Sequence, residues 1–319
     1  MPSDALPIYD SAIIGAGPAG LTAAIYLARY RRSVIVFDGG SSRAQWIPES
    51  HNCPGFPGGI SGVTLLQRLR TQLDAYEAPV CEDRIVALEQ RNEHFGLVAG
   101  SGRGFAARTV VIATGIVDVL PDVDWIEAAV QVGAVRLCAI CDGFEVTDQR
   151  IAVYGPSTSA LGHALFLRTY SADVSIVCSD QRGLDRADAD RATSAGVGVI
   201  DQTDQLLFDG RRCTFVSNNG ATATFDSVYP YLGCRVQSAL AKDLGAACDD
   251  KGSLEVSSDQ MTSVSGLYAA GDVVSDLNQI SVAVGQSGTA ATAIHNALPS
   301  NMKAGDGSIS EEAYEHAST

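Results

Sequence analysis

One strand–turn–helix–strand unit near the start of the chain constrains the fold more than any other feature. The apolar run Ala12-Ile13-Ile14 meets the turn "GAGPAG" at 15–20, and "LTAAIYLARY" follows with the character of a helix. The segment "SVIVFD" then returns as a strand that ends at Asp38. A glycine turn between strand and helix, with an acid after the next strand, is typical of dinucleotide-binding domains. The unit therefore predicts an α/β fold built on a parallel sheet.

The turn and the acid each have a physical role in such a domain. Gly15 makes the tight turn, Gly17 lets the backbone approach a pyrophosphate, and Gly20 lets the helix pack on the sheet. The helix N-terminus at Pro18–Ala19 then receives the phosphates. Asp38 is placed to accept hydrogen bonds from the ribose hydroxyls of an adenine dinucleotide.

Two later strands end in small residues, which a ligand lying across the carboxyl edge of the sheet can approach closely. The stretch "TVVIATG" ends at 113–115, and "GLYAAGDVV" carries a Gly-Asp step near the C-terminus. Both segments favour the same dinucleotide site. Besides the turn and Asp38, the residues expected along that site are Gly39, Ile85, Ala113, Thr114, Gly115, Gly271 and Asp272.

A second unit of the same kind, "RIAVYGPSTSALGHALFLRTYSADVSIVCSD", lies between these segments and departs from the pattern. Gly155 and Ala160 keep the small residues of the turn, but Ser157 stands at the middle glycine position. A Cβ there tends to hold a phosphate away from the backbone. Arginines that would pair with a 2′-phosphate are absent at the end of the next strand, where Asp180 would repel one. The sequence therefore argues against NADPH binding at this unit.

The stretch "CAICDG" at 138–143 brings two cysteines three positions apart, whereas the other cysteines of the chain are scattered. Such a pair is a redox dithiol, half of a metal site, or a coincidence. Zinc needs about four ligands, and no second close pair or histidine at ligand spacing accompanies this one, so we expect no metal site. We expect small buried side chains at the remaining cysteines, which are Cys53, Cys81, Cys178, Cys213, Cys234 and Cys248.

Charge and hydropathy restrict the partners and the location of the protein. The formal net charge of −15 argues against nucleic acid or an anionic membrane as a partner, because both would repel the chain. The sequence has no run of about eighteen apolar residues, and "MPSDALPIYD" lacks the basic start and apolar middle of a signal peptide. We therefore expect a cytoplasmic protein, whose 319 residues suggest two domains.

The order of these parts resembles that of the low-molecular-weight thioredoxin reductase family, over about residues 8 to 300. The stretches "SHNCPGFPGGISGVTLLQRLRTQ" and "LCAICDGFE" carry the resemblance further. It implies two Rossmann-like three-layer domains and a homodimer. A discontinuous FAD-binding domain would take residues 1–117 and 247–300, and a domain like an NAD(P)-binding one would take 118–246. The polar segment 301–319 is expected to be a mobile tail.

The resemblance also assigns roles at the cysteine pair and the dinucleotide site. The dinucleotide is FAD, and Asp272 matches the aspartate that holds its ribityl-pyrophosphate region. Cys138 and Cys141 match a redox-active disulfide at a helix N-terminus, where the dipole favours thiolate. Cys141 would face the flavin, and Cys138 would exchange with an outside disulfide. Asp142 matches the acid–base residue of the family.

A loop and a helix start would border the flavin ring under this resemblance. Asn52 matches an asparagine that contacts FAD, and Gln279–Ile280 match the helix N-terminus laid against the flavin, whose dipole stabilises negative charge. Arg43 either stabilises the reduced flavin or lies exposed in the loop. Trp46 is expected to be a core or interdomain contact rather than a stacking partner. His51 is equally open to both interpretations.

The activity implied is that of an FAD-dependent disulfide oxidoreductase, which passes electrons between flavin, the Cys138–Cys141 dithiol and a thiol substrate. That substrate would be a thioredoxin-like protein or a small thiol or disulfide. The degenerate unit argues that NADPH is not the donor, and a second FAD in the same region is one alternative occupant. The competing hypotheses are an NADPH-dependent thioredoxin reductase with drifted motifs, a ferredoxin-linked reductase or dithiol oxidase, and a non-enzymatic flavin redox sensor.

Overall fold

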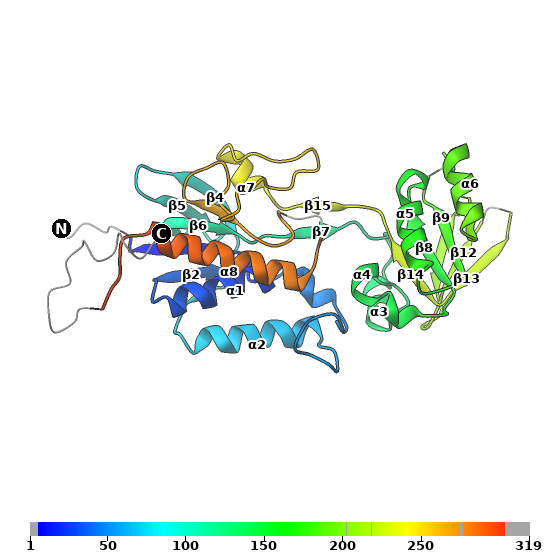
Figure 1. Cartoon of the computed structure of the whole chain (residues 1–319), viewed down its shortest axis with the longest axis horizontal. Helices are drawn as coiled ribbons and strands as arrows, with labels where there is room; N and C mark the ends of the chain where they lie inside the picture. Colours follow the sequence, from blue (N-terminus) through cyan, green and yellow to red (C-terminus); the bar gives the residue numbers. More distant parts are fainter. Residues whose placement is uncertain (1–5, 181, 202, 218, 275–276, 304–319) are drawn as a thin grey trace.

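Two lobes at opposite ends of an elongated molecule make up the computed structural model, which describes residues 6–180, 182–201, 203–217, 219–274 and 277–303 (Figure 1). The strand β7 (Ile116–Asp118) leads from the larger lobe to the smaller one, and β15 (Cys234–Val236) returns. The two strands pair antiparallel, with Asp118 opposite Cys234. The larger lobe is therefore discontinuous in sequence.

A seven-stranded sheet forms the centre of the larger lobe, in the order β3-β2-β1-β6-β5-β4, with β16 also paired to β6. The strands β1, β2, β3, β6 and β16 run parallel, while β4 and β5 join antiparallel. The bounds of these strands are β1 Ile8–Ile14, β2 Val34–Phe37, β3 Val80–Cys81, β4 Ile85–Gln90, β5 Phe95–Ala99, β6 Gly104–Ile112 and β16 Leu267–Ala269.

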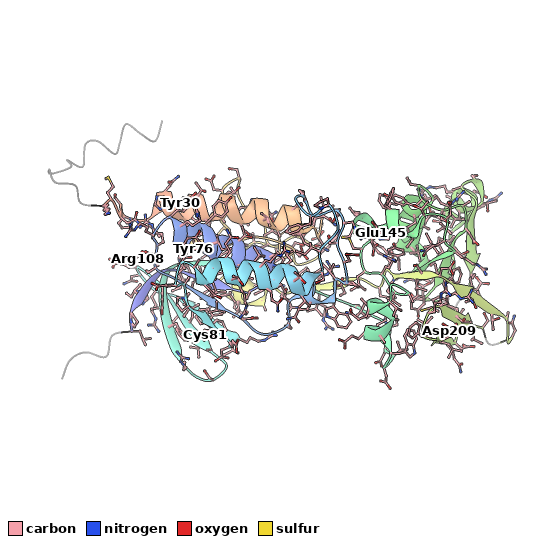
Figure 2. The ribbon with its side chains drawn as sticks, turned by 90° about the horizontal axis from the view of Figure 1, so that it is seen from below. Tyr30, Tyr76, Cys81, Arg108, Glu145 and Asp209 are labelled. Atoms are coloured by element: carbon pink, nitrogen blue, oxygen red, sulfur yellow. A yellow bond between two sulfur atoms is a disulfide. The ribbon has the colours of Figure 1, made fainter. Side chains whose placement is uncertain are left out.

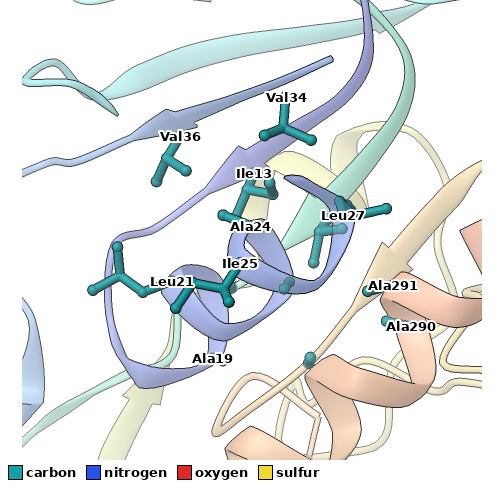
Figure 3. Packing of buried hydrophobic residues seen from close by; sticks show 14 of the residues in the cluster. Ile13, Ala19, Leu21, Ala24, Ile25, Leu27, Val34, Val36, Ala290 and Ala291 are labelled. Carbon is teal, nitrogen blue, oxygen red and sulfur yellow. The ribbon is translucent and has the colours of Figure 1, made fainter. Parts of the chain in front are cut away.

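Three helices cover one face of this sheet, namely α1 (Pro18–Arg29), α2 (Gly62–Asp74) and α8 (Ile280–Ala297). Figure 3 shows the apolar side chains between α1 and the strands, where Ile13, Leu21 and Leu27 are fully buried. Burial of each such side chain contributes about 1.5–3 kcal/mol. Small residues of α8 complete the layer at Ala290 and Ala291, where α1 and α8 pack against each other.

A second apolar cluster on the larger lobe contains Phe37, Leu97 and Ile112 together with Ala241 and Ala246. The short helix α7 (Ala239–Asp243) therefore belongs to the larger lobe. The division inferred from the sequence placed residues 239–246 in the smaller lobe. The chain re-enters the larger lobe earlier, directly after β15, because the apolar side of α7 is buried against that lobe.

The smaller lobe is a second Rossmann-like unit, with a parallel sheet in the order β10-β9-β8-β14. A three-stranded antiparallel sheet, β11-β12-β13, accompanies it. The prediction of two Rossmann-like α/β domains is thus confirmed. The elements are α3 Ile126–Gln131, α4 Ala139–Asp142, β8 Ile151–Gly155, α5 Ser157–Leu167, β9 Val174–Cys178, α6 Arg186–Ser194, β10 Val197–Ile200, β11 Gln205–Phe208, β12 Cys213–Val216, β13 Thr222–Phe225 and β14 Ser227–Pro230.

Other expectations for the chain have separate outcomes. Most of the tail expected at 301–319 lies outside the described residues, although Asn301 donates to the carbonyl of Tyr30. The prediction of buried cysteines is wrong for Cys234, which is exposed on β15 because this connecting strand lies between the lobes. Among the described residues, no helix is long and apolar enough to span a membrane, and no group of acidic, histidine or cysteine side chains is arranged to bind a metal.

Candidate active site

One cavity of about 690 Å³ extends from the glycine turn of the larger lobe to the cysteine pair of the smaller lobe. Figure 2 shows Glu145, which lines this cavity, on the side of the smaller lobe that faces the larger lobe. Of the residues predicted for the site, only Gly20 is not part of the lining. Those that line it are Gly15, Gly17, Pro18, Ala19, Asp38, Gly39, Arg43, His51, Asn52, Ile85, Ala113, Thr114, Gly115, Cys138, Cys141, Asp142, Gly271, Asp272, Gln279 and Ile280.

The glycine turn has the backbone geometry that its sequence predicts. Gly15 has a φ of +114°, and a Cβ there would overlap the carbonyl oxygen of Ala113. A Cβ at Gly20 would overlap the carbonyl oxygen of Gly15, so the helix packs tightly on the turn. Gly17 differs, because a Cβ there meets only Ser42 Oγ, at 3.3 Å. The cavity thus reaches the backbone at Gly17, beside the N-terminus of α1.

Asp38 lies at the end of β2, where it lines the cavity. Its Oδ1 accepts a hydrogen bond of 2.8 Å from the amide of Gly40, and its Oδ2 forms an ion pair with Arg70 of α2. Sequence reasoning missed Arg70, because the pairing joins residues 32 positions apart in the chain and leaves no local pattern. The ion pair holds the carboxylate at the cavity wall.

Arg43 begins a short 3₁₀ helix, η1 (Arg43–Trp46), and is not an exposed loop residue. Its Nε donates to Asp118 Oδ2 at 2.6 Å, and its Nη1 lies 3.8 Å from Asp272 Oδ2. Its side chain is only 20% exposed. Burial raises the pKa of Asp272 in spite of the Arg43 charge, which lowers it. The guanidinium thus connects the strand β7 with the predicted cofactor aspartate.

Trp46 packs against the apolar cluster of the smaller lobe that contains Ala129 and Val130 of α3. The helix η1 and α3 lie in contact. Trp46 is therefore an interdomain contact, as interpreted from the sequence.

The cysteine pair is a disulfide between Cys138 and Cys141. Cys138 is the N-cap residue of α4, and its Sγ lies 3.2 Å from the amide nitrogen of Cys141. Both cysteines line the cavity, on its smaller-lobe side. The disulfide therefore faces the same space as the glycine turn of the other lobe.

Two amide side chains of the larger lobe contact the segment 138–141, which carries the disulfide. The Nε2 atom of Gln279 lies 3.4 Å from Cys138 Sγ and 3.3 Å from Cys141 Sγ. Asn52 Nδ2 donates to Gln279 Oε1 at 2.8 Å and to the carbonyl of Ile140 at 3.4 Å. These contacts join the two lobes at the redox pair.

Asp142 follows the disulfide and is held by two residues that sequence reasoning missed. Its Oδ1 accepts a hydrogen bond of 2.8 Å from the hydroxyl of Tyr229, and its Oδ2 pairs with Arg136 Nη1 at 3.1 Å. Burial raises the pKa of this carboxyl, although the Arg136 charge and the Tyr229 hydrogen bond oppose the shift. The structure thus gives Asp142 a proton affinity above the ordinary value.

His51 and Gln286 differ in their surroundings. His51 is exposed and pairs with Glu49 at 3.1 Å, so it does not stack within the core. Gln286 of α8 accepts, through its Oε1, a hydrogen bond of 2.8 Å from the amide of Gly271. Gly271 has a φ of +85°, and its turn directs the amide to α8.

The two departures of the second unit are joined in the structure. Ser157 begins α5 with a fully buried side chain, and its Oγ donates to Asp180 Oδ1 at 3.0 Å. Arg182 forms an ion pair of 3.3 Å with the other oxygen of Asp180. The Ser157 hydroxyl and the Asp180 carboxylate are therefore hydrogen-bonded to each other, and they link the start of α5 to the end of β9.

The chain matches known proteins over most of its length. The profile of the pyridine nucleotide-disulphide oxidoreductase family matches residues 9–287. The thioredoxin reductase of Mycolicibacterium smegmatis is 30% identical over 298 residues, which cover 89% of this chain and 94% of that one. The bifunctional thioredoxin reductase/thioredoxin of Mycobacterium leprae is 29% identical over 308 residues, which cover 91% of this chain and 66% of that longer one.

Solved structures of similar proteins superpose on the chain over most of its length. The thioredoxin reductase from Streptococcus pyogenes superposes with a TM-score of 0.83 at 28% identity, covering 92% of this chain and 98% of that one. The protein HlmI superposes with a TM-score of 0.85 at 27% identity, covering 91% and 92%. The chain therefore belongs to the pyridine nucleotide-disulphide oxidoreductase family and is a flavin-dependent disulfide oxidoreductase of the thioredoxin reductase-like type.

Proposed function

We propose that the protein exchanges electrons between an FAD in the cavity, the Cys138–Cys141 disulfide and a thiol substrate, and that NADPH is not its electron donor. The observation that carries the exchange is the single cavity, which contains both the dinucleotide turn and the disulfide. The two redox groups would then lie in the same cavity, on opposite lobes. Electron transfer would need no diffusing carrier between them.

The residues present fit an FAD. Gly17 leaves the backbone open to a pyrophosphate beside the N-terminus of α1, where free amides and the helix dipole favour an anion. Asp38, directly after β2, lines the same cavity and can accept hydrogen bonds from ribose hydroxyls. Asp272, near Arg43, can hold the middle of the dinucleotide. A bound FAD supplies two-electron redox chemistry at its ring.

The disulfide is the point at which the substrate is reduced or oxidised. When the Cys138–Cys141 bond accepts two electrons, the Sγ–Sγ bond breaks, and one proton uptake leaves a thiol and a thiolate. The outer sulfur, which we assign to Cys138, then attacks a substrate disulfide and forms a mixed disulfide. Attack by Cys141 on that bond releases the substrate thiol and restores the original pair. Asp142 would give the leaving sulfur its proton.

The substrate we propose is a thioredoxin-like protein. Phe144 is 77% exposed and Ile140 is 50% exposed, and both lie within a few residues of the disulfide. Exposed apolar side chains beside a reactive group favour an apolar protein surface as the partner. Relatives of the chain are named thioredoxin reductases, and one of them is a fusion of a reductase with a thioredoxin.

The donor claim depends on the pair formed by Ser157 and Asp180. The hydroxyl of Ser157 is turned to Asp180 and buried, so neither a glycine amide free of a side chain nor this hydroxyl is available to a phosphate at the middle position of the turn. Desolvation would raise the pKa of Asp180, but hydrogen bonds from Ser157 and Arg182 lower it overall. The resulting carboxylate repels the 2′-phosphate of NADPH, where a site for that phosphate needs arginines.

Stopped-flow spectroscopy tests the donor claim. NADPH should bleach the flavin band at about 450 nm slowly or not at all, even at millimolar concentration, whereas dithionite should bleach it at once. The triple variant Ser157→Gly, Ser179→Arg and Asp180→Arg should bind NADPH more tightly than the unmodified chain. Rapid bleaching of the unmodified chain by micromolar NADPH would show that the pair does not block the nucleotide.

The ligand content of the purified protein tests a second FAD, which the degenerate unit would leave room for in place of a nicotinamide. We expect one FAD per chain in the cavity described above. Two FAD per chain would place another flavin at the second unit and would identify the group that supplies electrons in place of NADPH.

A further inference from the structure

Gln279 makes direct contact with the reacting sulfurs. We propose that Gln279 is a catalytic residue of the disulfide centre, whose side-chain amide donates to the thiolate formed on reduction, and that Asn52 is the residue that positions this amide. The inference rests on the proposed flavin–disulfide exchange and deepens it. It concerns the chain's own sulfur chemistry, and it can be measured with or without electron transfer through the flavin.

The contact of Gln279 with the sulfurs can form both with the disulfide and with the thiolate. Gln279 Nε2 lies 3.3 Å from Cys141 Sγ and 3.4 Å from Cys138 Sγ, so one N–H donor serves both sulfurs. A disulfide sulfur is a weak acceptor, whereas a thiolate is a charged one. Hydrogen bonds to charged acceptors are about twice as strong as those between neutral groups. The same amide therefore favours the reduced pair.

The orientation of the Gln279 amide is fixed by groups that can act in only one way. Gln279 Nε2 donates to the backbone carbonyl of Asn278 at 3.1 Å, and that carbonyl only accepts. Gln279 Oε1 accepts from Asn52 Nδ2 at 2.8 Å. Reversal of the amide would place Oε1 against the carbonyl and the sulfurs. The nitrogen therefore faces the disulfide.

The orientation of Asn52 is fixed by the carbonyl of Ile140, which can only accept. Asn52 Nδ2 also donates to the carbonyl of Ile140 at 3.4 Å, and its Oδ1 accepts from the buried hydroxyl of Ser50 at 3.1 Å. The hydrogen bonds therefore form one chain. Ser50 donates to Asn52, Asn52 donates to Gln279, and Gln279 donates to the sulfurs. An amide held by two partners needs less ordering when the thiolate forms.

The two sides of this chain of hydrogen bonds belong to different lobes. Ser50, Asn52 and Gln279 lie in the larger lobe, whereas Cys138, Ile140 and Cys141 lie in the smaller lobe. The amide can therefore stabilise a thiolate only while the disulfide faces the cavity. Reduction of the disulfide strengthens the contact that holds the lobes in this arrangement.

The test compares Gln279→Leu and Gln279→Glu with the unmodified full-length protein. Each is equilibrated with mixtures of reduced and oxidised dithiothreitol, which gives up two electrons as its own ring disulfide closes. Alkylation then counts the free thiols of Cys138 and Cys141. Loss of the donor should lower the equilibrium constant for reduction about tenfold, which is ~30 mV in midpoint potential. Gln279→Glu keeps the size of the side chain but replaces the donor with a charge that repels thiolate, so its shift should be larger.

The pH dependence of alkylation provides a second readout. In Gln279→Leu the reactive thiol should need a pH about one unit higher to reach half its maximal rate, and in Gln279→Glu the shift should be larger. Asn52→Leu should shift both quantities in the same direction by a smaller amount, because the amide stays but loses its orientation. Gln131, an exposed glutamine of α3 that lines the same cavity, provides the matched control, and Gln131→Leu should change neither quantity.

Unchanged potentials and alkylation profiles in both Gln279 variants would overturn the inference. Failure of the proposed function would look different. In that case the unmodified protein would titrate with dithiothreitol as described, and the Gln279 variants would shift, but its flavin would exchange no electrons with the disulfide.

Discussion

Tyr229 donates its phenolic hydrogen to Asp142 over 2.8 Å, from a strand on which its side chain is 1% exposed. Arg136 pairs with the other carboxylate oxygen, and Glu145 adds a nearby negative charge. Burial is the largest influence on the pKa of Asp142 and raises it, while Tyr229 and Arg136 limit the rise. The carboxyl beside the disulfide therefore holds its proton to a higher pH than an exposed aspartate.

Removal of the Tyr229 hydroxyl should raise the pKa of Asp142 further. Tyr229→Phe takes away a hydrogen bond that stabilises the carboxylate, and it leaves the ring in place. Thiol–disulfide exchange that needs protonated Asp142 falls as pH rises through this pKa, so the alkaline limb of the pH–rate profile should move to higher pH. Steady-state turnover of a disulfide substrate across a pH series measures the shift.

Asp142→Asn is the matched control for this profile, because it should remove the limb that Asp142 causes. A limb at the same pH in Tyr229→Phe and in the unmodified protein would contradict the assignment. The pKa shift of Asp142 also predicts how the free energy of unfolding depends on pH. Because the folded-state pKa of Asp142 is raised, its contribution favours folding at low pH and is lost as pH rises through the folded pKa.

The glycine turn allows a separation of cofactor binding from folding. In Gly17→Val the new Cβ meets only Ser42 Oγ, at 3.3 Å, so the chain should fold but lose FAD, because the Cβ stands where the pyrophosphate approaches. The ratio of FAD to protein after gel filtration measures the loss. Purification of Gly17→Val with a full complement of FAD would contradict the assigned position of the pyrophosphate.

Gly20→Val provides the contrast. Its Cβ would overlap the carbonyl oxygen of Gly15, so the helix must move off the sheet and the free energy of unfolding should fall by at least about 2 kcal/mol. Urea unfolding of the two variants should therefore separate a loss of ligand from a loss of packing.

Local patterns in the sequence predict the parts of this site that a few adjacent residues determine. The glycine turn is such a part, because Gly15 and Gly20 are required by backbone contacts within one unit. The cysteine pair is another, because three positions along one helical turn bring Cys138 and Cys141 together. Spacing and order identified the glycine turn and singled out the cysteine pair, whereas the assignment of that pair as a redox-active disulfide came from the family resemblance.

Partners from distant positions could not be predicted in this way. Asp118 lies 75 residues from Arg43, and Tyr229 lies 87 residues from Asp142, so neither pair leaves a local pattern. The Ser157–Asp180 pair could be predicted in part. Both residues were recognised as departures from the nucleotide motif, but only the fold shows that they bond to each other.

The central claim is that electrons pass between flavin and the Cys138–Cys141 pair, and anaerobic titration with a dithiol tests it most directly. A small dithiol can reach the disulfide and reduce it. The electrons then pass to the flavin, whose absorption band at about 450 nm loses intensity. We predict bleaching of the unmodified protein in proportion to added dithiol. Cys138→Ser with Cys141→Ser should keep its FAD and bleach far more slowly, while dithionite should bleach both proteins alike. Equal bleaching rates of the two proteins by the dithiol would contradict the claim.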